Sequence, residues 1–315
     1  MTLAMTDRLA DADATVRRLA VMDLPYSDED DIEPLLLPML ADPDAGVRTE
    51  SAKALEGFEA PETVAALAAL LLDADAGVRA AVADVLAELK EPAAAVPLIP
   101  LLTQGPADAR ASAFRAVRAL RSPAAFAPAL ASLRDPDAAV RREAVGVLGY
   151  LKDPAAVGEL AEVAANDPDG EVRRIAVGAL GYASSVSVLP ALTRALGDAV
   201  WVVREEAAQT LGKLRLGLAA PDLVHAMADD YWQVRVKAAR SLGWLKAEAG
   251  LPVLVSSLTH PVSNLRKEAV IALGEIGDTR AIAPLEASLA DPDPDVRKLA
   301  RLALTAIGNA ERSAP

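Results

Sequence analysis

The segment DPDAAVRREAVGVLGYLKDPAAV, Asp135–Val157, decides the fold of this chain, because variants of it recur along the whole sequence. Alignment on its valine–arginine pair gives ten anchors spaced 31 residues apart, with one interval of 32, and the second residue of every pair is arginine. A period of this length is typical of repeat proteins, in which each unit buries its core only against its neighbours. The anchors, which define repeats 1 to 10, are Val16, Val47, Val78, Ala109, Val140, Val172, Val203, Val234, Leu265 and Val296.

The residues that follow each anchor predict a helix, called helix B below. A small residue four positions after the anchor and a leucine eight after it, such as Ala144 and Leu148, share one helical face. A glycine at the next position, such as Gly149, predicts the end of that helix. Three positions before the anchor, an aspartate is expected to cap the helix N-terminus. The capping residues are Asp44, Asp75, Asp137, Asp169 and Asp293.

A second apolar stretch, often opened by proline, lies between successive anchors, as in LPALTRAL at Leu189–Leu196. Proline is tolerated in the first turn of a helix, so this stretch predicts a shorter helix A. The sequence therefore predicts an all-α fold, a right-handed α-solenoid of about ten two-helix repeats of 31 residues. It also predicts one domain that covers residues 1–315.

The repeat unit resembles the short HEAT repeat of the phycobilisome-lyase type along essentially the whole chain. The resemblance implies a superhelix with helix A on its convex side and helix B on its concave side. It also implies a buried ladder between repeats, made by the anchor arginines and by an aspartate five residues before most anchors. These aspartates are Asp11, Asp42, Asp73, Asp135, Asp167, Asp198, Asp229 and Asp291. Repeats 4 and 9 carry Gln104 and His260 there, so a ladder pair is doubtful in both.

Composition limits the function. The formal net charge of −13 disfavours nucleic-acid backbones and anionic membrane surfaces as partners. No cysteine is available for disulfides or thiolate chemistry. The N-terminal residues do not read as a signal peptide, and the apolar run Val64–Leu72 is too short to span a bilayer. We expect a cytoplasmic protein that is a monomer or a weak homodimer.

Catalytic chemistry finds no support in the sequence. HEAT-like proteins that resemble deoxyhypusine hydroxylase bind two irons through His-Glu pairs. The two histidines here, His225 and His260, are followed by alanine and proline. No phosphate-binding glycine loop is present, and the acidic run Ser27–Glu33 lacks the pattern of a calcium loop. We expect no enzyme activity, no metal and no cofactor.

Departures from the repeat pattern mark a candidate site. The capping position holds Val200, Tyr231 and Val262 in repeats 7 to 9, and the next position holds Trp201 and Trp232 in repeats 7 and 8. A second aromatic column lies ten residues after the anchor. Offsets of three, six and ten follow one stripe of helix B, opposite the apolar positions. The candidate partner-binding residues are Trp201, Tyr231, Trp232, Trp244, Tyr150, Tyr182, Glu206, Gln209, Lys213, Lys237 and Arg240.

Three functions and one structural explanation remain open at this point. The favoured function is a non-enzymatic scaffold or adaptor that binds a protein partner in the concave groove of repeats 5–8, because exposed aromatics beside arginine are typical of binding hot spots. The alternative is a bilin-lyase-like chaperone that handles a tetrapyrrole-bearing protein, and nucleic-acid binding is disfavoured by charge. The aromatic residues could instead fill gaps in an alanine-rich core.

Overall fold

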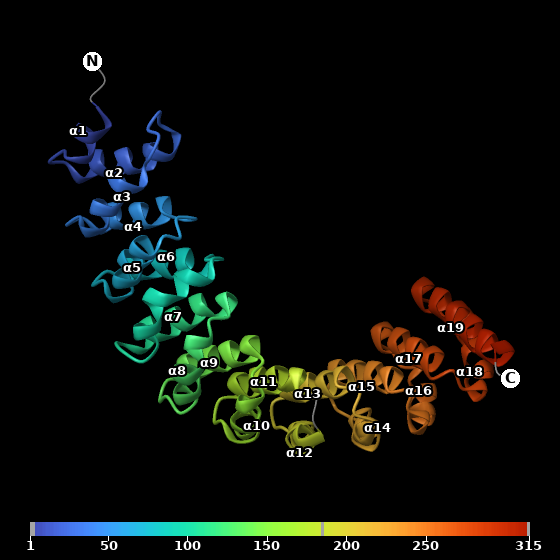
Figure 1. Ribbon diagram of the computed structural model, residues 1–315. Coiled ribbons are helices and arrows are strands. Elements are labelled where there is room, and N and C mark those ends of the chain that lie inside the picture. The colour runs from blue at the N-terminus through green and yellow to red at the C-terminus, as the bar shows by residue number, and fades with distance from the viewer. Residues whose placement is uncertain (1–3, 184–185, 314–315) are drawn as a thin grey trace. The chain divides into compact units, whose positions relative to one another are not determined.

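The computed structural model describes residues 4–183 and 186–313, and within these ranges the regular structure is helical without strands. The chain forms two compact units, Met1–Leu151 and Lys152–Pro315. In both units short helix A elements alternate with helix B elements in the predicted order (Figure 1). The prediction of an all-α solenoid fold is therefore confirmed. That residues 1–315 form a single domain stays a prediction.

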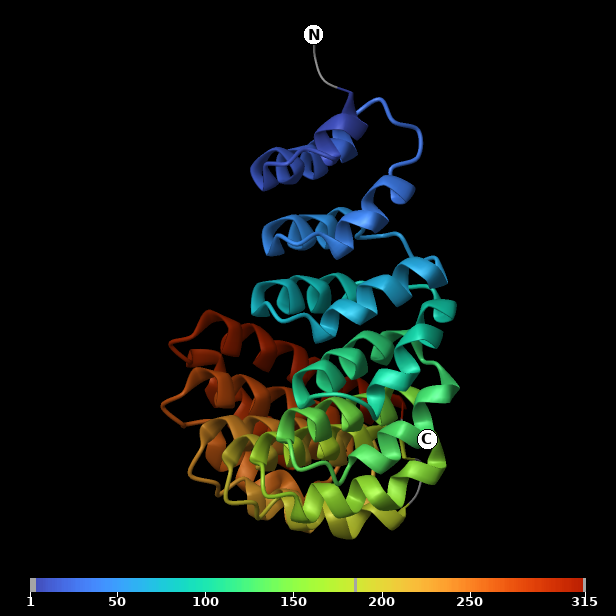
Figure 2. The ribbon, with the colours of Figure 1, turned by 90° about the vertical axis from the view of Figure 1, so that its left-hand side faces the viewer.

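In the unit Met1–Leu151, successive B helices pack side by side in chain order, and Figure 2 shows them as layers. The B helices of this unit are α2 (Ala14–Asp23), α4 (Ala45–Ala54), α6 (Ala76–Ala87), α7 (Ala107–Leu120) and α9 (Ala138–Leu151). The A elements are α1 (Met5–Leu9), α3 (Glu33–Leu36), η2 (Leu37–Ala41), α5 (Pro61–Ala69), η3 (Leu70–Leu72), η4 (Pro92–Leu102), η5 (Pro123–Ala125) and α8 (Phe126–Ser132). The element η4 is a 3-10 helix that contains Pro97 and Pro100, which cannot donate the hydrogen bonds of an α-helix.

In the unit Lys152–Pro315, the B helices again follow one another side by side (Figure 1). They are α11 (Gly170–Ala179), α13 (Trp201–Lys213), α15 (Trp232–Trp244), α17 (Ser263–Ile276) and α19 (Pro294–Ser313). The A helices are α10 (Val157–Asn166), α12 (Leu189–Ala195), α14 (Ala220–Ala226), α16 (Leu251–Ser257) and α18 (Ile282–Ala287). Short 3-10 turns precede these A helices, among them η9 (Gly217–Ala219) and η11 (Thr279–Ala281), and η12 (Ser288–Ala290) follows α18.

The core consists of the predicted positions of helix B. Anchor valines such as Val203 and Val234, and the alanines and leucines four and eight residues after the anchors, are buried almost completely. Each of the five predicted capping aspartates accepts a backbone N–H of the first turn, as Asp44 does from Val47 at 3.0 Å. These bonds satisfy donors that have no partner inside the helix. Both predictions are confirmed.

The glycines of α13 and α15 lie in the last turn of the helix rather than after it, which corrects the predicted helix end by about one residue. Gly212 lies inside α13 and Gly243 inside α15. A β-carbon at Gly212 would stand 2.6 Å from Cβ and 2.9 Å from Cα of Ser241 in the next B helix. Real atoms do not approach so closely, so the glycine is required by contact between two helices rather than by a turn.

In five repeats a residue in the left-handed conformation stands three residues beyond the glycine column, after the last turn of helix B. This position is occupied by Arg121, Lys152, Arg215, Lys246 and Gly277, whose φ angles lie between 50° and 79°. A left-handed residue after the last turn is a common helix terminator. Because four of the five carry a side chain, this stop has no glycine signal in the sequence.

Candidate protein-binding surface

The Arg–Asp ladder joins neighbouring repeats and so fixes the B helices that carry the candidate residues. Most anchor arginines pair with the turn aspartate of the next repeat, 25 residues later. In the pair Arg204–Asp229, Nε and Nη2 of the arginine lie 2.6 and 2.9 Å from the two carboxylate oxygens. The other bidentate pairs are Arg17–Asp42, Arg48–Asp73, Arg173–Asp198 and Arg266–Asp291.

Charge–charge attraction and hydrogen bonding hold these aspartates in the ionised form. The hydrogen bond from Arg17 is the largest cause of the lowered pKa of Asp42, and burial opposes it. The bond from Arg48 acts in the same way on the pKa of Asp73. Such bidentate, partly buried pairs carry geometric specificity as well as energy.

The two ladder positions flagged by the sequence differ from each other. At repeat 4, Arg79 lies 3.2 Å from Asp108, which stands four residues after Gln104 and takes the place of the missing turn acid. At repeat 9, Nε of Arg235 is buried and has no hydrogen-bond partner among the described residues. His260 performs only part of the role of the aspartate, because its Nδ1 accepts the backbone N–H of Val262 at 3.1 Å.

The rare aromatics gather where helix B begins in repeats 7 and 8. Trp201 is the first residue of α13, and Tyr231 occupies the capping position before α15. Their rings stack with centroids 5.3 Å apart and planes 7° apart. Tyr231 is 45% exposed and Trp201 is half-buried. The stack crosses from one repeat to the next, as the sequence predicted for the tryptophans, but its second ring is Tyr231 rather than Trp232.

Arg204 is a member of this cluster that the sequence analysis assigned only to the ladder. Its guanidinium carbon lies 5.6 Å from the centroid of the Tyr231 ring, within the range of a cation–π contact. The 25-residue ladder spacing could have revealed this contact, because Tyr231 lies two residues after Asp229. Asp229 accepts from Nε and Nη2 of Arg204, and the backbone oxygens of Asp198 and Ala199 accept from its Nη1. The exposed part of the cluster therefore offers aromatic surface more than charge.

The charged candidates in the middle of helix B bond to one another across repeats. Lys237 donates from Nζ to Oε1 of Gln209 at 2.8 Å, and Arg240 makes two bonds of 2.7 Å to Glu268. Glu206 lies 3.7 Å from Arg174. These pairs occupy cations that could otherwise bind a phosphate backbone.

The second aromatic column lies at the other end of the B helices, about 18 Å from the first at the rise of an α-helix. The Tyr182 hydroxyl donates to the backbone oxygen of Asp153 at 2.8 Å, and burial raises its pKa. Trp244 is half-buried and Lys213 is exposed. Tyr182 thus joins two repeats, which is the gap-closing role that the sequence left open.

Tyr150 belongs to the other compact unit, at the end of α9. It is 46% exposed, and the guanidinium carbons of Arg118 and Arg121 lie 5.7 and 6.0 Å from its ring centroid. The sequence analysis did not foresee these two arginines. Their contact with Tyr150 repeats the pairing of arginine and tyrosine found at Tyr231.

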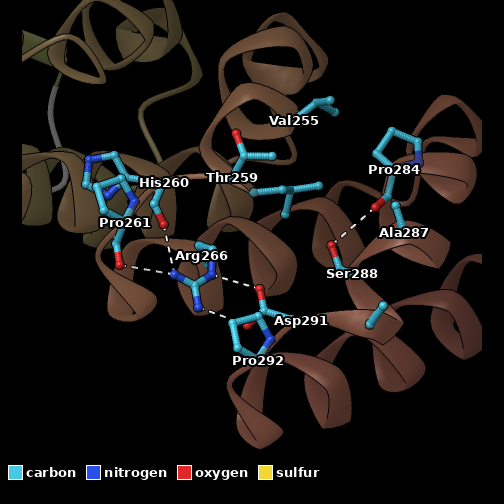
Figure 3. Close-up of a pocket in the computed structure, with 12 residues that line it drawn as sticks. Val255, Thr259, His260, Pro261, Arg266, Pro284, Ala287, Ser288, Asp291 and Pro292 are labelled. Carbon is cyan, nitrogen blue, oxygen red and sulfur yellow. Dashed lines mark hydrogen bonds and ion pairs between the residues drawn. The ribbon is translucent and has the colours of Figure 1, made fainter.

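A pocket of about 490 Å³ lies at the turn of repeat 9, and none of the candidate residues lines it (Figure 3). Its polar groups are already bonded: Arg266 donates to Asp291 and to the backbone oxygens of His260 and Pro261, and Ser288 donates to the backbone oxygen of Pro284. Within the described residues, no group of three His, Asp or Glu side chains is arranged to hold a metal.

Comparison with known sequences identifies the repeat. A sequence model of HEAT repeats matches residues 2–87, 52–118, 95–177, 159–233 and 220–305. The chain belongs to the HEAT repeat family. No curated protein matches its sequence significantly. In the part of the chain that the structure describes, no helix has the length and apolar character required to cross a bilayer.

Solved structures share the HEAT fold at low identity. An engineered protein is 22% identical with a TM-score of 0.54, and the match covers 96% of this chain and 98% of that one. Importin beta is 14% identical with a TM-score of 0.65, over 96% of this chain and 50% of its own. A structure that describes Kap95p binding to RanGDP is 14% identical with a TM-score of 0.66, over 96% and 49%. The chain therefore spans about half the length of the last two proteins.

Proposed function

We propose that this protein is a non-enzymatic scaffold that binds a protein partner along the B helices of repeats 6 to 8. The observation that carries the proposal is the exposed stack of Trp201 and Tyr231 backed by Arg204. Aromatic side chains beside arginine are enriched in the residues that dominate binding energy. Tyr150 carries a similar contact in the other unit, but the proposal rests on the unit Lys152–Pro315 alone.

The chemistry of the surface favours apolar or aromatic anchors on the partner. Two cations of the stripe are paired internally, Lys237 with Gln209 and Arg240 with Glu268, so a charged peptide would have to displace those bonds. A partner side chain would contact the exposed part of Tyr231, whose ring also contacts Trp201 and Arg204. HEAT proteins of the same fold bind proteins, as the structure of Kap95p with RanGDP illustrates, and this likeness supports a protein partner.

The test is capture of partners from an extract of the native cell on immobilised protein, followed by affinity measurement with the partner identified. The variant Tyr231→Ala, combined with Trp201→Ala, should weaken binding by about 30-fold or more, the loss of a hot spot worth at least 2 kcal/mol. The matched control is Leu218→Ala, an exposed apolar residue in η9 on the helix A side of the same unit. Unchanged affinity in a folded double variant would refute the assignment.

The phycobilisome-lyase subtype and the handling of a tetrapyrrole form the second candidate. The repeat resemblance suggests it, and the flat Trp201–Tyr231 stack is a surface on which a planar pigment could lie. Titration of the protein with a bilin separates the two functions. A shift of the bilin absorbance that disappears in the double variant would favour the tetrapyrrole, and an unchanged spectrum would favour the protein partner alone.

A further inference from the structure

The two ends of the repeat array carry matching halves of the contacts that join neighbouring repeats inside it. A complete ladder contact has three parts. In the first, Nη1 of Arg17 donates to the backbone oxygen of Asp11 in its own turn. In the second, Oδ1 of Asp42 accepts the N–H of Asp44. In the third, Arg17 and Asp42 then form their two bonds of 2.7 and 2.8 Å.

Asp11 and Arg297 each make the backbone bond of one part of the ladder contact. Neither makes the ionic bonds of the third part. Oδ1 of Asp11 accepts the N–H of Asp13 at 2.8 Å, as Asp42 accepts that of Asp44. Nη1 of Arg297 donates to the backbone oxygens of Asp291 and Pro292. Neither the Asp11 carboxylate nor the remaining donors of Arg297 has an ionic partner among the described residues. One end thus presents an acceptor, and the other a donor, in ladder geometry.

The neighbouring positions repeat this complementarity. Lys267, two residues after its anchor, lies 2.9 Å from Asp293, which stands three residues before the next anchor. The corresponding residues at the two ends of the array are Lys298 and Asp13. Both are exposed and carry opposite charges.

A third contact is charged only at the ends. Within the array, Ser241 donates from Oγ to the backbone oxygen of Ala208, which places offset seven of one B helix beside offset five of the preceding one. Internal repeats carry uncharged residues at both offsets. The last repeat has Arg301 at offset five, and the first has Asp23 at offset seven, where it pairs with Arg8. The charges of Arg301 and Asp23 would each disfavour packing of that end on an apolar surface. The two charges are opposite in sign, so they could face each other.

The fourth contact is ionic between repeats 8 and 9, where Arg240 at offset six binds Glu268 at offset three of the next repeat. It is apolar between repeats 9 and 10, where Ile271 and Leu299 hold the same offsets. The same offsets at the two ends of the array hold Leu302, 58% exposed, and Leu19, 50% exposed. Paired with each other, these leucines would leave water together.

We propose that two copies of this chain associate head to tail, with α19 of one copy packed on α2 of the next. Arg297, Lys298 and Arg301 of one copy then face Asp11, Asp13 and Asp23 of the other, and Leu302 contacts Leu19. The contact is heterologous, so further copies can add at each free end until the assembly closes or extends as a filament. This inference concerns the ends of the array and goes beyond the proposed binding surface on repeats 6 to 8.

The experiment measures the mass of the chain of residues 1–315 by light scattering from low to high micromolar concentration. The wild type should gain mass with concentration and lose it as salt screens the charges. Each of the variants Arg297→Glu and Asp11→Arg places like charges together and should weaken self-association by more than about tenfold. An equimolar mixture of the two variants should associate again, because each altered end meets its complement.

Two controls make the outcome decisive. Arg280→Glu makes the same charge change on η11, at an exposed residue outside the proposed contact, and should leave association unchanged. The pair Arg301→Glu and Asp23→Arg repeats the exchange at exposed positions if the first pair fails to fold. A wild type that stays monomeric, association that only one variant of a pair weakens, or a mixture that stays monomeric would each overturn the proposal.

Discussion

The turn of repeat 9 carries histidine at the position where most turns carry the ladder aspartate. His260 still accepts the N–H of Val262, but an imidazole carries no negative charge and cannot replace a carboxylate beside a guanidinium. Arg235 therefore keeps a buried Nε without a partner. An unpaired buried donor costs free energy that a bonded one does not.

We expect His260→Asp to stabilise the protein by about 1.5 to 3 kcal/mol, the value of a hydrogen bond to a charged group. Aspartate would accept the N–H of Val262 and also pair with Arg235. The free energy of unfolding is measured by urea denaturation followed by circular dichroism. His260→Asn is the matched control, because asparagine supplies the acceptor for Val262 without the charge. Equal gains from both variants would show that the turn, and not the ion pair, limits stability.

Glycine decides how closely the B helices pack in the unit Lys152–Pro315. Gly212 faces Ser241, Gly243 faces Ala272 and Gly274 faces Ala303, each at a distance that leaves no room for a methyl group. The sequence predicted the helices and their buried faces correctly, because periodicity reports which side of a helix is apolar. It placed the helix ends slightly too early, because a glycine at a helix contact and a glycine at a helix end look the same in one sequence.

We expect Gly212→Ala to destabilise the protein by about 1 to 3 kcal/mol, the usual cost of forcing extra atoms into a packed contact. The matched control is Gly158→Ala in α10, where a β-carbon meets nothing within 4 Å. That change should stabilise by about 0.5 to 1 kcal/mol, because alanine loses less backbone entropy in a helix. Urea midpoints of the two variants compared with the wild type test both signs. A Gly212→Ala variant as stable as Gly158→Ala would contradict the close-contact explanation.

At the scale of the whole molecule, the ladder ties stability to pH. The pKa values of Asp42, Asp73 and Asp291 are lowered in the folded state, chiefly by hydrogen bonds from Arg17, Arg48 and Arg266. A carboxyl with a lowered pKa binds fewer protons when folded than when unfolded. Its contribution is therefore complete above the unfolded value of 3.8 and is lost as the pH falls below it.

Because the same pair recurs along the chain, these losses add within one window of pH. We expect these pairs to contribute no change in the free energy of unfolding between neutral pH and about pH 5, and a steep loss below the unfolded value. Urea unfolding at a series of pH values measures this curve. Arg48→Gln removes one pair and should make the acid loss shallower than in the wild type. A ladder that loses its contribution already above pH 5 would contradict this account.

For the whole molecule, the sequence predicts the repeat architecture. It predicts only part of the candidate surface. Ten arginines in register predict the helix pairs, and the missing caps of repeats 7 and 8 point to Trp201 and Tyr231. Which ring stacks on Tyr231 depends on the rotation of one helix against the next, which a single sequence does not encode. The same holds for Arg118 beside Tyr150. That these residues bind a partner stays a prediction.

The glycine column also bears on elasticity. At Gly212 and Gly243 one B helix contacts the next with little side chain between them. Sliding or twisting of these two helices against each other would therefore bring backbone atoms into contact after a small displacement. In the unit Met1–Leu151 the equivalent positions in α6 and α7 hold Ala87 and Arg118, and a flexible side chain can yield before a backbone does. We therefore expect the junction between α13 and α15, which carries the Trp201–Tyr231 stack, to resist sliding more than the junctions at Ala87 and Arg118.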